Sequence, residues 1–338
     1  MLPRGKGWIM KAWHIENLNR IKLVESVLPK KEGEIKLKMS KVAISSTDLA
    51  YFAADGDSEK DNKVVVPGHS AVAYVSSDDG DSGLKLGARV VVSPFVRYEE
   101  HGVGKVKVLG VDVDGLLSDF VSVPEDNVYA LPDGIPDDEA IFAEYIALGN
   151  NVLNSLDADK GDFVVIVGAS TLGLILSQLA LYYQMIPILV DLDAEKLALA
   201  ASWGVYYLLN PTYDNLERRV EEITGGRMAE VSVYVGDGVP FDCAFRLVKD
   251  KGEVVVAGYS VRSGHNIDVS DILAKQLRVI GVADGYGEMS SAINLLANRI
   301  IKTEGLISTR IGFDDVPEMV EQCAEYPYQY NKILVTLD

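Results

Sequence analysis

The feature that most constrains the fold is a junction between an apolar run and a glycine-containing loop near the middle of the chain. Residues 163–167 read Phe-Val-Val-Ile-Val, the continuous apolar run that a parallel strand buried on both faces requires. The loop Gly168-Ala169-Ser170-Thr171-Leu172-Gly173 follows directly, and residues 172–183 then read as a helix. A first glycine permits the tight turn from strand to helix, and a last glycine lets the helix pack closely on the strand. The junction therefore predicts a βαβ unit.

The same alternation continues toward the C-terminus, which predicts a parallel, doubly wound α/β sheet. The further elements expected are strands over Pro187–Val190, Val231–Val235, Glu253–Ala257 and Arg278–Val282, and a helix over Ala194–Ser202. We assign residues 147–286 to this Rossmann-type domain.

A second, β-rich domain is expected from the flanking residues. Residues 34–45 alternate apolar and polar side chains, the period of a half-buried strand, and residues 139–153 read as an amphipathic helix. The other elements expected are short strands over Val64–Val66, Ala71–Val75 and Ala88–Val92, a helix over Met289–Ile300 and a final strand over Ile333–Leu337. We assign residues 1–146 and 287–338 to this domain.

The glycine loop has the form G-x-S-x-x-G, one substitution from the G-x-G-x-x-G fingerprint. The N–H groups and partial positive charge of a helix N-terminus bind a pyrophosphate, so Gly168, Ser170, Thr171, Leu172 and Gly173 are the expected phosphate-binding residues. The Ser170 β-carbon crowds this approach, although its hydroxyl is able to donate to a phosphate oxygen. The alternative is that the glycines serve packing alone.

Asp191 ends the second expected strand, 23 positions after Gly168. This is near the offset of about 20 residues expected for a carboxylate that binds the adenosine ribose. Such a carboxylate repels a 2′-phosphate, so the sequence predicts NAD(H) rather than NADP(H). The alternative role for Asp191 is a helix cap for residues 194–202, for which Asp193 is an equal candidate.

Composition excludes several classes of protein. The chain of 338 residues has 32 Lys and Arg against 50 Asp and Glu, a net charge of −18, which argues against nucleic acid as a partner. Two cysteines form no disulfide framework and no four-cysteine zinc site, and they favour a reducing, cytoplasmic compartment. The most apolar window, residues 172–190, contains several polar residues and Pro187, so no membrane span is expected.

The order of parts resembles the medium-chain dehydrogenase/reductase superfamily, and more narrowly its zinc-type polyol, threonine and alcohol dehydrogenases. The resemblance covers nearly the whole chain. Its markers are Ile44-Ser45-Ser46-Thr47-Asp48, Pro67-Gly68-His69, Gly87-Ala88-Arg89-Val90, Phe142-Ala143-Glu144, the Gly168–Gly173 loop, residues 252–258 and Asn331-Lys332-Ile333. It implies a GroES-like catalytic domain beside the Rossmann domain, a small-molecule substrate, and a homodimer or homotetramer that pairs through the edge of the dinucleotide-binding sheet.

The chain departs from the zinc-type pattern at the metal ligands. The resemblance places Ser45 where relatives have a cysteine, Ser70 where they have a glutamate and Ala50 where a histidine is often found. The lobe that carries four structural-zinc cysteines falls between Pro94 and Asp112, and this chain has none there. A serine hydroxyl binds Zn²⁺ poorly, which leaves His69 and Glu144 as weak residual ligands. The sequence therefore predicts no structural zinc and favours a site without catalytic zinc.

Hydride transfer without zinc requires an acid or base beside the substrate oxygen. His69 is the best candidate because its ordinary pKa lies near neutrality. The resemblance implies that Asp48 holds the imidazole from behind, that Thr47 is the hydroxyl relay residue, and that the nicotinamide lies over Thr47, His69 and Glu144. Ser45 and Tyr51 are further hydroxyls able to relay a proton, and Glu144 is expected to set the protonation state of His69.

Less specific roles remain open for these residues. Thr47 and Asp48 are also preferred helix caps, His69 fits a structural loop residue, and Glu144 fits a solvated or salt-bridged helix position. Cys243 and Cys323 fall in helical stretches and are expected in the core.

We therefore expect an NAD(H)-dependent oxidoreductase that interconverts a secondary alcohol or polyol and its ketone. The alternatives are a zinc-independent quinone or enone reductase and a dinucleotide-binding protein without catalysis.

Overall fold

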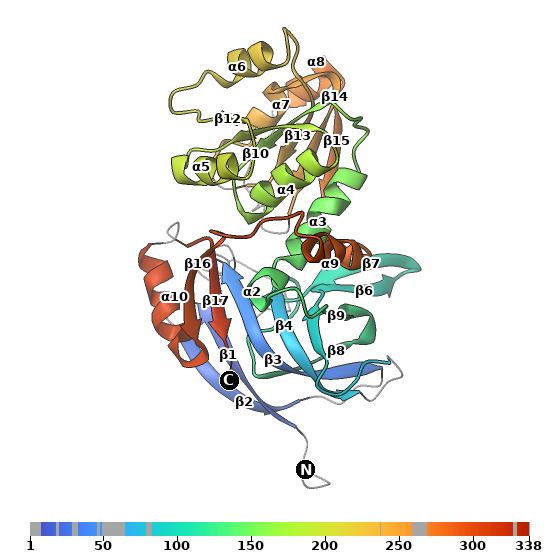
Figure 1. The fold of residues 1–338 in the computed structure, drawn as a ribbon, viewed down its shortest axis with the longest axis vertical. Helices are drawn as coiled ribbons and strands as arrows, with labels where there is room; N and C mark the ends of the chain where they lie inside the picture. Colours follow the sequence, from blue (N-terminus) through green and yellow to red (C-terminus); the bar gives the residue numbers. More distant parts are fainter. Residues whose placement is uncertain are drawn as a thin grey trace. The chain divides into compact units, whose positions relative to one another are not determined.

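The computed structural model describes residues 8–17, 20–28, 33–45, 48, 65–78, 83–236, 238–258, 269–326 and 330–337. The chain divides into two compact units (Figure 1). The first is formed by Met1–Glu144 and Thr303–Asp338, and the second by Tyr145–Lys302. The helix over residues 289–297, which the sequence analysis placed with the β-rich domain, therefore lies in the second unit.

The first unit is built on a mixed seven-stranded sheet. Its strands are β3 (Glu34–Ser45), β4 (Ser70–Asp78), β5 (Arg89–Val92), β8 (Phe120–Pro124), β9 (Val128–Ala130), β16 (Ile307–Gly312) and β17 (Lys332–Thr336). They run in the order β16-β17-β3-β4-β5-β9, with β8 also paired to β3. Only β16 and β17 pair in parallel among these strands. β17 thus lies beside β3, the strand that ends at the first candidate site residue, Ser45.

Two hairpins complete the strands described in this unit. They are β1 (Ile9–Asn17) with β2 (Arg20–Val27) and β6 (Phe95–Glu100) with β7 (Val103–Val108). The second hairpin occupies the stretch where the resemblance placed the structural-zinc lobe. The side chains of its two strands are linked by an ion pair between Glu100 and Lys105. They also make a cation–π contact, in which the Lys107 ammonium lies 4.6 Å from the centre of the Tyr98 ring.

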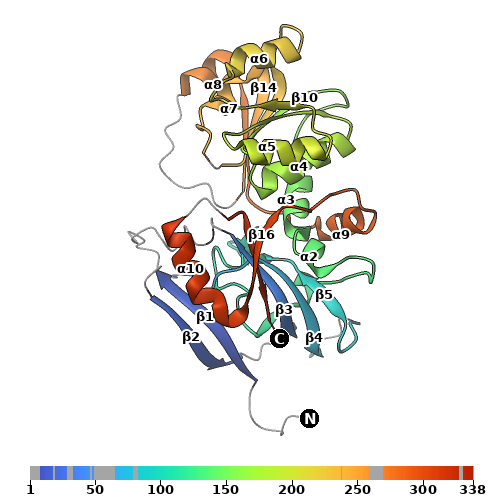
Figure 2. The same ribbon diagram turned by 60° about the vertical axis from the view of Figure 1, so that its left-hand side comes forward.

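The helices of the first unit are short, except for the last. They are η1 (Glu125–Asn127), α2 (Asp137–Ala140), η2 (Phe313–Asp315) and α10 (Val316–Glu325), and α3 (Ala143–Asn154) begins in this unit and continues in the second. α10 lies beside β16 in both views (Figures 1 and 2). Its Val316, Met319, Val320 and Cys323 join the apolar core formed by β3, β4 and β17.

The second unit is a six-stranded parallel sheet. Its strands are β10 (Phe163–Val167), β11 (Ile186–Val190), β12 (Tyr207–Leu209), β13 (Ala229–Tyr234), β14 (Val248–Ala257) and β15 (Arg278–Val282). They run in the order β12-β11-β10-β13-β14-β15, and every pairing is parallel. The order reverses direction between β10 and β13, which is the switch point where ligands bind in such sheets.

Helices on both faces bury the apolar strands of this sheet (Figure 2). They are α4 (Thr171–Tyr182), α5 (Ala194–Ser202), α6 (Leu216–Ile223), α7 (Cys243–Arg246) and α8 (Val269–Lys275). A further helix of this unit, α9 (Met289–Ala297), lies beside α3 and not on the sheet (Figures 1 and 2). Several begin at side chains that accept a backbone N–H, as N-caps do. Ser170 caps α4, Asp193 caps α5 and Asn215 caps α6.

The structure confirms the two-domain α/β prediction and corrects details of it. Val65 and Val66 do not form a strand, because their N–H groups bind the Asp114 carboxylate instead of a neighbouring strand. The helix expected over 139–153 is broken into α2 and α3. No helix in the described part of the chain is long and apolar enough to cross a membrane.

Candidate active site

The glycine loop is shaped by close backbone approaches. Gly168 has φ +109°, and a β-carbon there would collide with the carbonyl oxygen of Gly236. A β-carbon on Gly173 would collide in the same way with the carbonyl oxygen of Gly168. Both positions therefore require glycine for the turn and for the packing of α4, as the sequence predicts. The twelve-residue helix α4 presents its N-terminus at this loop, so the loop fits a pyrophosphate.

Ser170 has a role that the sequence analysis did not assign. Its φ is −64°, which any residue adopts, and its hydroxyl oxygen accepts the N–H of Gly173 at 3.4 Å. The serine is therefore the N-cap of α4. This bond does not use the hydroxyl hydrogen, so the hydroxyl is still able to donate a hydrogen bond to an acceptor such as a phosphate oxygen.

Asp191 lies immediately after β11 and is 3% exposed. One carboxylate oxygen accepts the N–H of Ala169 at 2.5 Å, and the other accepts the N–H of Asp193 at 2.8 Å. Asp193, not Asp191, caps α5. The Asp191 carboxylate is thus held against the glycine loop by two backbone donors, at the place expected for a ribose-binding residue.

In the first unit, His69 lies on a loop that is held by backbone contacts. Gly115, Leu116 and Leu117 donate N–H bonds of 2.7–3.1 Å to the carbonyl oxygens of residues 66, 68 and 67, respectively. Gly68 has φ +93°, and a β-carbon on Gly115 would collide with its carbonyl oxygen. Segment 115–117 therefore fixes the loop and delivers His69 to the start of β4.

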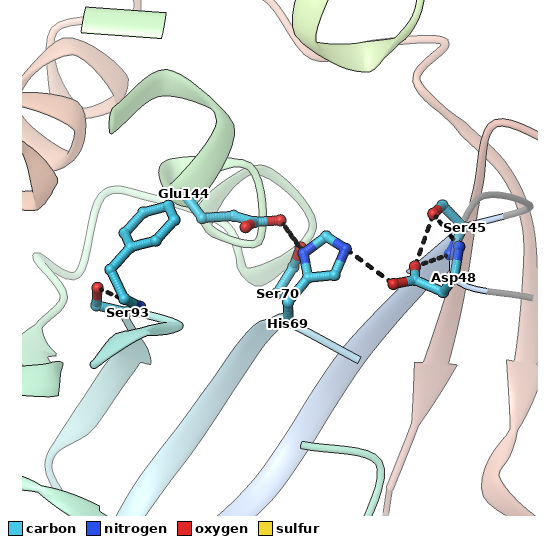
Figure 3. Close-up of polar contacts among 7 residues, drawn as sticks. Ser45, Asp48, His69, Ser70, Ser93 and Glu144 are labelled. Carbon is cyan, nitrogen blue, oxygen red and sulfur yellow. Dashed lines mark hydrogen bonds and ion pairs between the residues drawn. The ribbon is translucent and has the colours of Figure 1, made fainter. Parts of the chain in front are cut away.

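His69 lies between two carboxylates (Figure 3). Its Nε2 is 3.0 Å from Asp48 Oδ1, and its Nδ1 is 2.5 Å from Glu144 Oε1. Glu144 comes from the first turn of α3, and Asp48 follows β3. All three side chains are buried, with His69 and Glu144 each 2% exposed. Both ring nitrogens are thus engaged by carboxylates, as hydrogen-bond donors in the imidazolium form.

Two serines extend this arrangement. Ser45 donates from its N–H and its hydroxyl to Asp48 Oδ2, each at 2.6 Å, and its hydroxyl oxygen accepts the Asp48 N–H at 3.1 Å. This reciprocal pattern is a capping box, and the spacing Ser45-x-x-Asp48 is the sequence signal that identifies it. Ser70 donates its hydroxyl to Glu144. Ser45, Asp48, His69, Glu144 and Ser70 therefore form one continuous hydrogen-bonded chain.

The opposite charges in this series of hydrogen-bonded side chains stabilise one another. Burial and the nearby Lys332 charge disfavour the imidazolium, but Asp48 and Glu144 outweigh both and raise the pKa of His69 to about 9. Burial also opposes ionisation of Asp48, yet the His69 charge, Lys332 and the Ser45 hydrogen bond hold its pKa well below the usual value. The pKa of Glu144 is lowered by His69 and Lys332 against the same burial effect. Near neutral pH the histidine is therefore an imidazolium between two carboxylates.

Lys332 is the residue of this site that the sequence analysis missed. It lies at the start of β17, opposite Ser45 in the antiparallel pairing of β17 with β3, and it is 1% exposed. Its ammonium lowers the pKa of both Asp48 and Glu144. In the sequence, Asn331-Lys332-Ile333 is a marker of the family resemblance and assigns no role to Lys332. A lysine inside an apolar strand pattern was the available signal, because lysine is almost never fully buried without a partner.

The donor set does not fit a catalytic zinc ion. Such a site needs three protein ligands, with thiolate, imidazole or carboxylate donors. Here Ser45 offers a neutral hydroxyl that is bound to Asp48, and His69 has no ring nitrogen that is not bound to a carboxylate. The described residues contain no group of three or more His, Cys, Asp and Glu side chains able to hold a metal ion.

Three of the residues singled out from the sequence, Ala50, Thr47 and Tyr51, lie outside the described residues. The structure brings Ser45, Asp48, His69 and Glu144 together in the first unit, and Gly168, Ser170, Gly173 and Asp191 together in the second. Thr171 and Leu172 form the first turn of α4. Cys243 and Cys323 are both free and buried, as expected.

A β-rich unit joined to a parallel sheet with this switch point defines a two-domain, nucleotide-binding class of protein. Residues 31–133 match the family model described as the alcohol dehydrogenase GroES-like domain, and residues 171–298 match the model described as zinc-binding dehydrogenase. The two matches fall on the two units in turn. The chain belongs to the medium-chain dehydrogenase/reductase superfamily, a superfamily of dehydrogenase-type oxidoreductases.

Full-length relatives agree with this assignment. An uncharacterized zinc-type alcohol dehydrogenase-like protein of Haemophilus influenzae is 26% identical over 337 residues, which cover 96% of this chain and 98% of the relative. Sorbitol dehydrogenase 1 of Saccharomyces cerevisiae is 25% identical and covers 94% of this chain and 93% of its own length. A structure named short chain alcohol dehydrogenase from Escherichia coli, complexed with NADH, has a TM-score of 0.82 at 23% identity and covers 98% of this chain and 100% of its own.

Proposed function

We propose that the protein is an NAD(H)-dependent oxidoreductase that interconverts a secondary alcohol or polyol and its ketone. The observation that carries the proposal is the glycine loop, in which two collisions require glycine and the Asp191 carboxylate is held against the loop. The sorbitol dehydrogenase of yeast and the NADH-bound relative of Escherichia coli support the substrate class and the cofactor.

The residues of the second unit fit the cofactor in a specific way. Gly168, Gly173 and the N-terminus of α4 would hold the pyrophosphate, and the Ser170 hydroxyl would donate to one of its oxygens. Asp191 would bind the ribose hydroxyls and repel a 2′-phosphate, which favours NAD(H) over NADP(H). When bound, the dinucleotide accepts or supplies the hydride.

The first unit supplies the proton chemistry in this proposal. Oxidation of an alcohol releases a proton, and reduction of a ketone needs one. Because both nitrogens of His69 are bound to carboxylates, we assign to it the role of a fixed positive charge rather than that of the exchanging acid or base. The Ser45 hydroxyl, which is bound to Asp48, ends the hydrogen-bonded series of side chains, and we assign to it the exchange of the proton with the substrate oxygen. Thr47 is a second hydroxyl beside it in sequence.

A cofactor-resolved substrate screen tests this function. Purified protein is mixed with NADH or NADPH and a panel of ketones and enones, and with NAD or NADP and a panel of secondary alcohols and polyols. We expect turnover of alcohols and ketones with the non-phosphorylated cofactor. Turnover of enones with NADPH would instead assign a reductase of conjugated double bonds. Tight NADH binding with no absorbance change on any panel would assign a binding protein.

Two further features belong to the same proposal. The free, buried state of Cys243 and Cys323 supports a reducing, cytoplasmic compartment. The exposed edge strand β15, where Val279 is 44% exposed, supports assembly into a homodimer or homotetramer through the edge of the parallel sheet.

A further inference from the structure

Lys332 is placed beside the His69 cluster by strand register. It lies directly opposite Ser45 in the antiparallel pair β17–β3. Opposite residues in such a pair have their side chains on the same face, with β-carbons about 4.5–5.5 Å apart. Ser45 in turn donates twice to the Asp48 carboxylate. The backbone therefore brings the lysine side chain to the face of the sheet that carries Ser45, whose hydroxyl binds Asp48.

The four buried ionisable groups carry charges that cancel. Both ring nitrogens of His69 lie against carboxylate oxygens, 3.0 Å from Asp48 and 2.5 Å from Glu144, so one imidazolium faces two carboxylates and Lys332 is the second cation beside them. None of the four side chains is more than 7% exposed, so solvent does not screen them. Breaking such a group by removing one member leaves an uncompensated buried charge, which is strongly destabilising.

The neighbouring side chains preserve this balance. Ser45 and Ser70 each donate a hydroxyl hydrogen bond to one of the two carboxylates, and neither serine adds a charge. The donor set around His69 also does not fit a metal ion, as shown above. The His69 imidazolium offsets the negative charge of one carboxylate. The Lys332 ammonium, from another part of the chain, is then what offsets the charge of the other.

We propose that Lys332 is a positioning residue whose ammonium group makes the Asp48–His69–Glu144 cluster electrically neutral and thereby fixes His69 between the two carboxylates without a metal ion. The catalytic consequence rests on the proposed function, but the effect on the stability of the first unit does not. The lysine itself does not touch the reacting groups in this proposal; it acts through Asp48 and Glu144.

The test compares charge with bulk at position 332. Lys332→Met keeps the length of the side chain and removes the charge, Lys332→Arg keeps the charge, and the double variant Lys332→Met with Glu144→Gln restores neutrality. We expect Lys332→Met to lower the Tm of the first unit by roughly 10 °C. We expect Lys332→Arg to restore more than half of that loss, and the double variant to be more stable than Lys332→Met alone. A double variant whose loss equals or exceeds the sum of the two single losses would overturn the proposal.

Folding and activity are separated by further measurements. If Lys332→Met does not fold, the arginine and double variants decide: the proposal requires both to fold, and failure of either overturns it. In variants that fold, kcat should fall about tenfold or more for Lys332→Met while the KM for NADH changes less than about threefold, because the cofactor loop is intact. Equal effects of Lys332→Met and Lys332→Arg on Tm would show a packing role and contradict the proposal.

Lys275→Met is the matched control. This lysine of the second unit is also partly buried, and its ammonium donates to the carbonyl oxygens of Phe245, Arg246 and Val248. It has no part in the cluster, so its removal is expected to affect the second unit and to show no coupling with Glu144→Gln. If the wild-type protein turns over no substrate at all, the proposed function fails, and the Tm comparison still decides the role of Lys332.

Discussion

The two sites of this protein are held in shape by different physical means. The glycine loop of the second unit is shaped by the backbone: two positions have no room for a β-carbon, and Asp191 is held by backbone N–H groups. The His69 cluster of the first unit is held by buried charges: the Asp48 and Glu144 carboxylates stabilise the imidazolium, and Lys332 stabilises the two carboxylates. A site made by steric fit responds to side-chain volume and little to pH. A site made by charges responds to pH and to any change of charge.

The largest effect is expected from filling the glycine loop. Gly173→Ala places a β-carbon against the carbonyl oxygen of Gly168, so α4 has to move away from the turn. We expect NADH affinity to fall by about a hundredfold or more, measured by fluorescence titration, which corresponds to about 3 kcal/mol. Gly134→Ala is the control, because a β-carbon there meets no atom within 4 Å. Equal affinity in the two variants would refute the steric account of the loop.

The next effect is a pH dependence confined to the first unit. The pKa of His69 is raised from 6.5 to about 9, so its contribution to stability is fully present below about pH 6.5 and is lost as pH rises through about 9. The shift corresponds to about 3 kcal/mol, shared among the coupled charges. Urea unfolding of the first unit at pH 6, 7.5 and 9 measures it.

The carboxylates give the opposite dependence at low pH. The pKa values of Asp48 and Glu144 are lowered, so their contribution is present above their ordinary values and is lost on acidification. His69→Gln is the control for the alkaline arm, since it removes the titrating group and should flatten the decline toward pH 9. A decline that is unchanged in this variant would show that another group is responsible.

A smaller effect is expected at Asp191. Replacing it with asparagine removes the negative charge and one of the two acceptors for backbone N–H groups. We expect the KM for NADH to rise about tenfold, or roughly 1.4 kcal/mol, and the preference over NADPH to shrink, because a 2′-phosphate is no longer repelled. Asp193→Asn is the matched control, since asparagine caps α5 as well as aspartate does. An unchanged NADH-to-NADPH ratio in Asp191→Asn would remove Asp191 from cofactor selection.

The smallest effect is expected at Ser170. Glycine is only a few tenths of a kcal/mol worse than serine as an N-cap, so Ser170→Gly should barely change the stability of the second unit. We expect NADH affinity to change by less than about threefold, because easier approach of the pyrophosphate offsets the lost hydroxyl donor. A much larger loss of affinity would mean that the hydroxyl contact dominates.

The difference between the two sites also explains what the sequence was able to predict. The glycine loop is local, so its strand, turn and helix follow from adjacent residues, and β10 and α5 begin and end where expected. The residue types of the first site followed from the family resemblance, but their arrangement depends on contacts between distant segments. His69 and Glu144 are 75 residues apart, and Lys332 reaches the site only because β17 pairs with β3.

The missed elements have different causes. The hairpin β6–β7 stands where the resemblance placed a metal-binding lobe, and most residues of its strands are exposed or only half-buried, so the strands lack a clear apolar alternation. Val65 and Val66 have strand-like side chains, but the Asp114 carboxylate takes the N–H groups that a neighbouring strand would need. For Val65 and Val66, a contact outside the local pattern therefore decides the structure.

The most direct test of this account measures metal content and turnover in one preparation. Protein purified without added metal is analysed for zinc and assayed with NADH and a ketone substrate before and after dialysis against a chelator. We predict less than stoichiometric zinc and the same turnover in both assays, because Asp48, His69, Glu144 and Lys332 balance one another without a metal ion. One zinc per chain, with activity that is lost on chelation and restored by zinc, would contradict it.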